Sequence, residues 1–150
     1  MIGSIVAKKK LESGFRHLCD KNLDKFMADW SENGVFHYPG QLSVSGTFRG
    51  KADIKNWFQN MMDHYESIEF KLNHICVENL FDVTGNNNLI AQWTVNLINN
   101  EGSKVSNVGA NLVRIESRKI VEVRDFFYYP ERLAIGWCEQ KPLIKEKSVA

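Results

Sequence analysis

The strand that decides the fold of this chain reads Lys119-Ile-Val-Glu-Val-Arg-Asp-Phe-Phe-Tyr-Tyr129. Successive side chains of a strand point to opposite faces of its sheet. One face of this strand is therefore expected to carry Val121, Val123, Asp125 and Phe127. A carboxylate placed among valine and phenylalanine either finds a buried partner or has a raised pKa. Asp125 is for this reason the first candidate for a functional group.

Length and composition are ordinary for a soluble globular protein. The chain has 150 residues and a formal net charge of +1, which fits one domain with a sizeable core. This charge gives no electrostatic reason to expect nucleic acid or an anionic membrane as a partner. Lys8-Lys9-Lys10 follows the short apolar start instead of preceding it, unlike the charges of a secretion signal. We therefore expect a cytoplasmic protein.

The cysteines and histidines show no metal-binding pattern. Cys19, Cys76 and Cys138 are odd in number and widely spaced, which argues against a disulfide framework or a structural zinc site. The histidines lack the H-x-x-x-H spacing of a metal site. We expect neither a metal nor a disulfide.

Helical periodicity dominates the first half of the chain. Apolar repeats predict one helix from about Ser4 to Cys19, a second from the N-cap Asn22 past Trp30 to Asn33-Gly34, and a third from about Lys51 to His64. Between the last two helices, Val35-Phe-His-Tyr-Pro39 is expected to be extended, because residues before proline avoid the helical region. A loop or short strand is expected over residues 40–48.

After His64 the apolar period changes from 3.6 to 2, which is typical of strands. The inward face of the first strand is expected to carry Ile68, Phe70, Leu72, His74 and Cys76. Further strands are expected at residues 89–97, 103–115 and 119–129, joined by short turns. Helices followed by hairpin-linked strands predict an α+β domain with the helices packed on a curved antiparallel sheet. Residues 140–150 are expected to form a frayed tail.

Four pieces of the sequence resemble the nuclear-transport-factor-2-like superfamily, and within it the SnoaL-like polyketide cyclase and ketosteroid-isomerase-like group. They are Asn22-Leu-Asp-Lys-Phe-Met-Ala-Asp-Trp30, Val35-Phe-His-Tyr-Pro39, Phe48-Arg-Gly-Lys-Ala-Asp-Ile54 and Ile120-Val-Glu-Val-Arg-Asp-Phe-Phe127. The resemblance covers about residues 5 to 137. It implies a single SnoaL-like domain over residues 1–150 with a cystatin-like cone, in which a pocket lies between helices and sheet.

The resemblance also assigns roles to individual positions. Steroid isomerases of the group carry a general-base Asp where this chain has Tyr38, and an oxyanion-hole pair where it has Gly14 or Phe15 and Asn111. The resemblance therefore does not imply steroid isomerisation by that route. SnoaL-like cyclases place their catalytic Asp in the last strand, at the position of Asp125, and often have His where this chain has Asn111.

The candidate catalytic residues are Asp125, Asn111 and Tyr38. Asp125 would act as a general base on carbon next to a carbonyl, while Asn111 and Tyr38 orient the substrate oxygen. The alternatives are an Asp125 paired for structural reasons, an Asn111 amide satisfied by a neighbour and a Tyr38 that only packs. The ligand pocket is expected to be lined by Phe15, Trp30, Phe36, Trp57, Met61, Phe70, His74, Trp93, Asn107 and Phe127.

The most concrete hypothesis is a small cofactor-independent enzyme of the cyclase or isomerase type that acts on an apolar carbonyl compound. A hydrolase or dehydratase in the same pocket remains open and would need a further polar partner near Asp125, such as His74 or Tyr38. A non-catalytic ligand-binding or interaction module also remains open. A homodimer is expected through the outer sheet face, which carries Gln92, Thr94, Asn96, Ser106, Val108 and Ala110.

Overall fold

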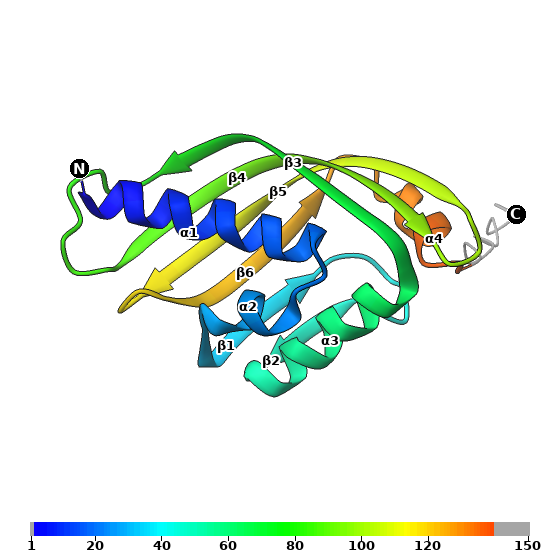
Figure 1. Ribbon diagram of the computed structural model, residues 1–150, viewed down its shortest axis with the longest axis horizontal. Helices are drawn as coiled ribbons and strands as arrows, with labels where there is room; N and C mark the ends of the chain where they lie inside the picture. Colours follow the sequence, from blue (N-terminus) through cyan, green and yellow to red (C-terminus); the bar gives the residue numbers. More distant parts are fainter. Residues whose placement is uncertain (1, 140–150) are drawn as a thin grey trace, which may run out of the picture.

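The computed structural model describes residues 2–139, so the expected frayed tail lies outside the described residues. The helices are α1 (Ile2–Cys19), α2 (Leu23–Ala28), α3 (Lys51–His64) and α4 (Glu131–Gly136). The strands are β1 (Trp30–Tyr38), β2 (Gly46–Arg49), β3 (Tyr65–Val77), β4 (Asn87–Asn99), β5 (Lys104–Glu116) and β6 (Lys119–Phe127). Figure 1 shows α1, α2 and α3 over one face of a curved sheet and α4 at one end of it.

The six strands form one sheet in the order β2-β1-β6-β5-β4-β3. This arrangement confirms the expected α+β fold with helices on a curved sheet. The sheet is mixed, however, because β1 pairs with β6 in parallel and the other neighbours pair antiparallel. A parallel pair needs a long connection, and here β2, α3 and the β3–β5 hairpins lie between the two strands along the chain.

The second helix is shorter than the apolar spacing predicts. Asn22 caps α2 as expected, since its side chain accepts a hydrogen bond from the amide of Lys25 at 3.2 Å. The helix ends at Ala28, and Trp30 already pairs with Ile120 in the sheet. The prediction of a helix up to Asn33-Gly34 was therefore wrong. The register of β1 shifts between Trp30 and Val35, so Gly34 marks an irregular strand instead of a helix end.

Two β-bulges change which side chains face the helices. The register of β3 shifts between Leu72 and His74, with Asn73 as the extra residue. Such an insertion reverses the alternation beyond it, so Ile75 packs against the core while His74 is exposed. A similar shift opposite Ile115 makes Val121 the extra residue in β6, and Ile120 is buried in its place. The inward positions predicted for His74 and Val121 were therefore wrong.

Helix α4 was not predicted, and it contributes to the wall between helices and sheet. Pro130 precedes it and Gly136 ends it, a proline-then-glycine pattern that marks helix ends. The carbonyl oxygen of Gly136 accepts hydrogen bonds from Asn99 Nδ2 at 3.2 Å and lies 2.9 Å from His64 Nε2. The indole of Trp137 stacks on His64 with ring centroids 4.9 Å apart. These contacts hold α4 on the rest of the domain.

Among the helices of residues 2–139, none combines the length and the apolarity needed to cross a membrane.

Replacing Asn99 with alanine should lower the free energy of unfolding by about 2 kcal/mol, because buried backbone groups lose their partners. Asn99 is fully buried, and its Oδ1 accepts hydrogen bonds from the amides of Glu101 and Ser103. Urea unfolding measures the change. Asn96→Ala is the matched control, since Asn96 is exposed in the same strand and its loss should cost less than about 0.5 kcal/mol. Equal losses in the two variants would contradict the stabilising role given to Asn99.

Candidate active site

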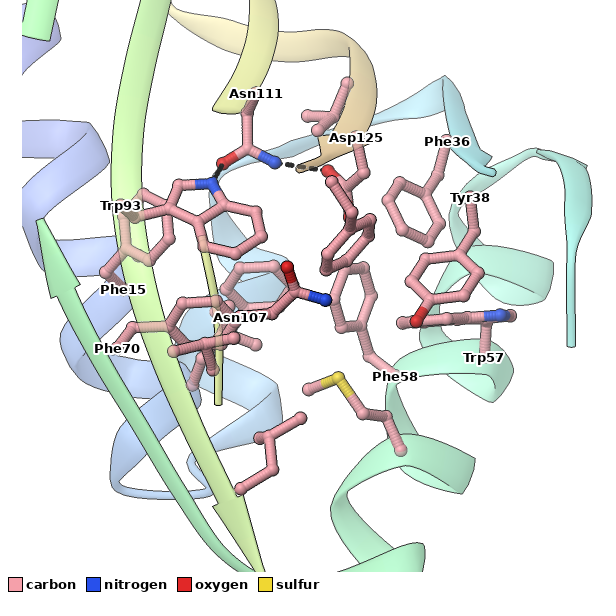
Figure 2. Close-up of a pocket in the computed structure, with 18 of the residues that line it drawn as sticks. Phe15, Phe36, Tyr38, Trp57, Phe58, Phe70, Trp93, Asn107, Asn111 and Asp125 are labelled. Atoms are coloured by element: carbon pink, nitrogen blue, oxygen red, sulfur yellow. Dashed lines mark hydrogen bonds between the residues drawn. The ribbon is translucent and has the colours of Figure 1, made fainter. Parts of the chain in front are cut away.

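An inner cavity of about 100 Å³ lies between the helices and the inner face of the sheet. Figure 2 shows aromatic side chains surrounding it, with a few amide, phenol and carboxyl groups among them. The cavity wall includes the expected residues Phe15, Trp30, Phe36, Trp57, Met61, Phe70, Trp93, Asn107 and Phe127. The candidates Asp125, Asn111 and Tyr38 line the same cavity. His74 does not line it, because the bulge at Asn73 turns its side chain to the outer face.

Several residues of the cavity wall were not predicted from the sequence. Trp137, Leu133 and Gly136 come from α4 and its C-terminal end. The Pro130-to-Gly136 pattern was the available signal for this helix, but at six residues α4 is too short for a recognisable apolar period. Tyr65 also lines the cavity, at the point where α3 passes directly into β3.

Asp125 and Asn111 face each other across neighbouring strands. They are directly paired residues of β6 and β5, and Asn111 Nδ2 donates a hydrogen bond to Asp125 Oδ1. The other end of the amide is also fixed, because Trp93 Nε1 donates to Asn111 Oδ1 at 2.6 Å. Figure 2 shows this chain of two hydrogen bonds along one side of the cavity. Since the indole holds the amide oxygen, the amide NH₂ must face Asp125.

Gly109 makes this arrangement possible. It is paired with Trp93 across β4 and β5, and a Cβ atom at this position would lie 2.5 Å from Cη2 and 2.7 Å from Cζ2 of the indole. The carbonyl oxygen of Phe126 would be closer still. Any side chain at position 109 would therefore displace the indole that orients Asn111. The glycine reads as an ordinary strand residue in the sequence, so the pattern gave no sign of this role.

Burial raises the pKa of Asp125 to about 7, and the hydrogen bond from Asn111 opposes this shift. Desolvation disfavours the ionised carboxylate, whereas a donated hydrogen bond stabilises it. Asp125 keeps part of its surface accessible and lines the cavity. Within residues 2–139, its Oδ2 atom accepts no hydrogen bond. Asp125 thus presents one free oxygen to the cavity and exchanges its proton near neutral pH.

Tyr38 supplies a neutral hydrogen-bond donor. Its hydroxyl oxygen accepts a hydrogen bond from Trp137 Nε1 at 2.9 Å, and its hydroxyl hydrogen has no acceptor within residues 2–139. Burial raises the pKa of Tyr38 well above its usual value, so the phenol stays protonated at neutral pH. Its ring packs edge-on against Phe127, with centroids 5.6 Å apart. Tyr38 is therefore free to donate to a ligand oxygen in the cavity.

Two other polar side chains near the site, Asn107 and His37, make structural contacts. Asn107 donates to the carbonyl oxygen of Tyr129 at 2.9 Å and accepts from the amide of Tyr129 at 3.2 Å, which anchors the chain after β6. His37 lies 3.0 Å from Glu122 and 2.9 Å from Thr47, outside the cavity. Across residues 2–139 we find no group of three histidine, cysteine or acidic side chains placed to hold a metal ion.

A curved sheet that encloses an apolar cavity with helices is the fold that this chain shares with nuclear-transport-factor-2-like proteins of known structure. Within this class the chain belongs to the SnoaL-like domain family, whose sequence model matches residues 12–123. No curated protein matches the chain.

Solved structures share the fold at low sequence identity. Bal32a from a soil-derived mobile gene cassette has a TM-score of 0.76 at 15% identity, covering 90% of this chain and 98% of its own. A candidate isomerase from Bacillus subtilis has a TM-score of 0.75 at 20% identity, covering 93% and 98%. An M. tuberculosis LEH-like epoxide hydrolase has a TM-score of 0.68 at 17% identity, covering 89% and 90%. At such identities the likeness concerns the fold alone.

Replacing Trp93 with phenylalanine should raise the pKa of Asp125 above about 7, because Asn111 loses the donor that orients it. Weakening one hydrogen bond to a charged group by about 1.4 kcal/mol corresponds to a tenfold higher proton affinity. Carboxyl ¹³C NMR titration measures the pKa. Trp57→Phe is the control, because Trp57 also lines the cavity but donates to the carbonyl oxygen of Val44. An unchanged pKa in Trp93→Phe would show that the indole does not control Asp125.

Proposed function

We propose that the protein is a small SnoaL-like enzyme of the isomerase or cyclase type that abstracts a proton next to the carbonyl group of an apolar substrate. One observation carries the proposal: among the described residues lining the inner cavity, Asp125 is the one carboxylic acid, and its pKa is raised to about 7 by burial. A general base works best when its pKa lies near the working pH. No cofactor is needed for this step.

The proposed step uses three groups. The free Oδ2 of ionised Asp125 takes a proton from the carbon next to the carbonyl, and the electron pair of the broken C–H bond moves onto the carbonyl oxygen. Tyr38 donates a hydrogen bond to this oxygen as its negative charge develops. Asn111 keeps the other oxygen of Asp125 in place. Return of the proton to a different carbon gives an isomer, and attack of the enolate carbon on a second carbonyl closes a ring.

The dimensions of the inner cavity limit what reacts there. An apolar cavity of about 150 Å³ binds a molecule the size of benzene, and the inner cavity measures about 100 Å³. Because the inner cavity is smaller than one that holds benzene, a short chain with its carbonyl group is the part of the substrate placed beside Asp125. The aromatic wall favours an apolar, flat group in this position.

A non-catalytic ligand-binding module is the second candidate. The aromatic side chains leave little free volume, and Asp125 is already paired with Asn111. A hydrolase or dehydratase has less support. It would need a further polar side chain near Asp125, and of the two candidates His74 lies on the outer face, so that Tyr38 alone remains. Catalysis by Asp125 is the feature that separates the enzyme from the binding module.

Hydrogen–deuterium exchange of acetone, which is small enough for the inner cavity, tests the base directly, because a base that removes the proton next to the carbonyl must exchange it in D₂O. Proton NMR should show protein-dependent exchange that rises with pH and levels off above about 7, as Asp125 becomes ionised. Asp125→Asn should lower the rate roughly 10²–10⁴-fold. Tyr38→Phe should lower it roughly 10²–10³-fold, because one donor to the developing charge is lost.

Asp20→Asn is the control for loss of an acid, since Asp20 is exposed and lies outside the inner cavity. Asparagine at position 125 still accepts the hydrogen bond from Asn111, which preserves the fold. Equal exchange rates in wild type and Asp125→Asn would eliminate the proposed enzyme and leave the binding module.

We also propose a homodimer through the outer sheet face. This face carries the exposed apolar side chains of Ile90, Leu112 and Phe126, and exposed apolar patches mark association sites. Sedimentation velocity should give a dimer for wild type and a monomer for Leu112→Arg, because a charge would be buried without a partner. Ile135→Arg, at an exposed position of α4, should remain dimeric. A monomeric wild type would rule out this interface.

A further inference from the structure

A second, larger hollow lies next to the inner cavity. This outer hollow measures about 330 Å³ and is lined by Val6, Ala7, Lys10, Asp82, Val83, Gly85, Asn87, Ile115 and Arg118. It lies between the first half of α1 and the segments joining β3 to β4 and β5 to β6. Lys10 lines both the outer hollow and the inner cavity. The side chain of Lys10 is therefore part of the wall of both spaces.

Lys10 is held in this position by an ion pair. Its Nζ atom binds Asp29 Oδ1, and the two side chains are 15% and 32% exposed. Because the ammonium group is turned toward Asp29, which lines neither space, the methylene stem is the part of Lys10 left to contact a ligand.

The polar side chains of the outer hollow are largely occupied by the loop that carries them. Asp82 accepts hydrogen bonds from the amides of Thr84 and Gly85 at 2.9 and 3.0 Å. Asn87 donates to the carbonyl oxygen of Asn79 at 2.8 Å and accepts from its amide at 3.1 Å. What these residues leave for a ligand is the exposed side chain of Arg118 and the apolar surface of Val6, Ala7, Val83 and Ile115.

The outer hollow opens at an apolar end of the molecule. Figure 1 shows the start of α1 beside the β3–β4 loop at this end. The exposed apolar side chains of the two segments are Ile5, Val6, Leu80, Phe81 and Val83. Val6 and Val83 belong both to this apolar end and to the lining of the outer hollow. Exposed apolar side chains at the mouth of a hollow are typical of a ligand-binding entrance.

We propose that the outer hollow binds the apolar tail of an extended carbonyl compound, whose carbonyl end lies beside Asp125 and whose chain passes Lys10. The proposal rests on the proposed function for the position of the carbonyl end. It adds the substrate class: a ketone with a small reacting end and a long unbranched or narrow apolar tail. It also assigns Val6 and Val83 to the entrance of this site.

A series of methyl ketones from 2-hexanone to 2-tridecanone tests the proposal, with binding measured by quenching of tryptophan fluorescence. The inner cavity is lined by several indoles, which report on the carbonyl end. Each methylene group that leaves water should lower Kd about fourfold. The gain should continue beyond the chain length that the inner cavity alone accommodates, because the outer hollow takes up the additional groups.

Two variants locate the tail. Val6→Trp and Val83→Trp place a large ring at the entrance and should abolish the gain from chain lengthening. Ile5→Trp is the matched control, since Ile5 is exposed on the same helix but does not line the outer hollow, and it should bind the series like wild type. The proposal is overturned if the long ketones gain nothing over the short ones in wild type, if none of the ketones binds, or if the Val6 and Val83 variants keep the full gain.

The acetone exchange assay separates this proposal from the proposed function. Acetone has no tail, so its exchange in wild type and Asp125→Asn reports on the base alone. The dependence of Kd on chain length in Asp125→Asn reports on the outer hollow without the base. Chain-length-dependent binding without exchange would reject the base and keep the tail site, whereas exchange without chain-length dependence would reject the tail site alone.

Discussion

The burial of one carboxyl group on an aromatic-lined wall is the constraint on which the site depends. Ionised Asp125 loses hydration in this position, and burial of a charge is costly unless hydrogen bonds replace the water. The structure supplies a hydrogen bond from Asn111, and Asn111 in turn is oriented by Trp93. One bond is enough to hold the carboxyl group but too little to keep its pKa at the usual value, which is raised to about 7. This one hydrogen-bond partner among the described residues is thus the reason why Asp125 is held in place and still has a raised pKa.

Local irregularities of the sheet, as much as its regular alternation, place Asp125 and its neighbours on the inner face. The bulge at Val121 sets the phase of β6, so that Val123, Asp125 and Phe127 follow Ile120 on the inner face. The bulge at Asn73 removes His74 from the same face. Gly109 then gives the indole of Trp93 the space it needs. Each feature involves one residue, and together they determine which polar groups reach the cavity.

The sequence was informative where the pattern was long and regular. The strand periodicity identified β4, β5 and β6, and the sequence analysis named eight of the twelve aromatic residues that line the inner cavity. The prediction from sequence was wrong where a single residue changed the local structure. A bulge cannot be recognised from apolar periodicity, so His74 was predicted to face the core. The apolar spacing up to Trp30 fits a helix as well as a strand that starts with a buried tryptophan, so α2 was predicted too long. Helix α4 was missed because its six residues are too few for a periodic signal. The hydrogen bonds from Trp93 and Trp137 depend on contacts between distant parts of the chain, which no local pattern contains.

The contact between Trp137 and Tyr38 links the position of α4 to the protonation state of Asp125. Trp137 donates to Tyr38 and forms part of the cavity wall, so transient detachment of α4 would admit water to Asp125. Hydration lowers the pKa of Asp125 toward the ordinary carboxyl value, and the ionised form therefore favours the detached state. A rise in pH through about 7 would therefore favour detachment of α4, and close packing of this helix would favour the protonated form of Asp125.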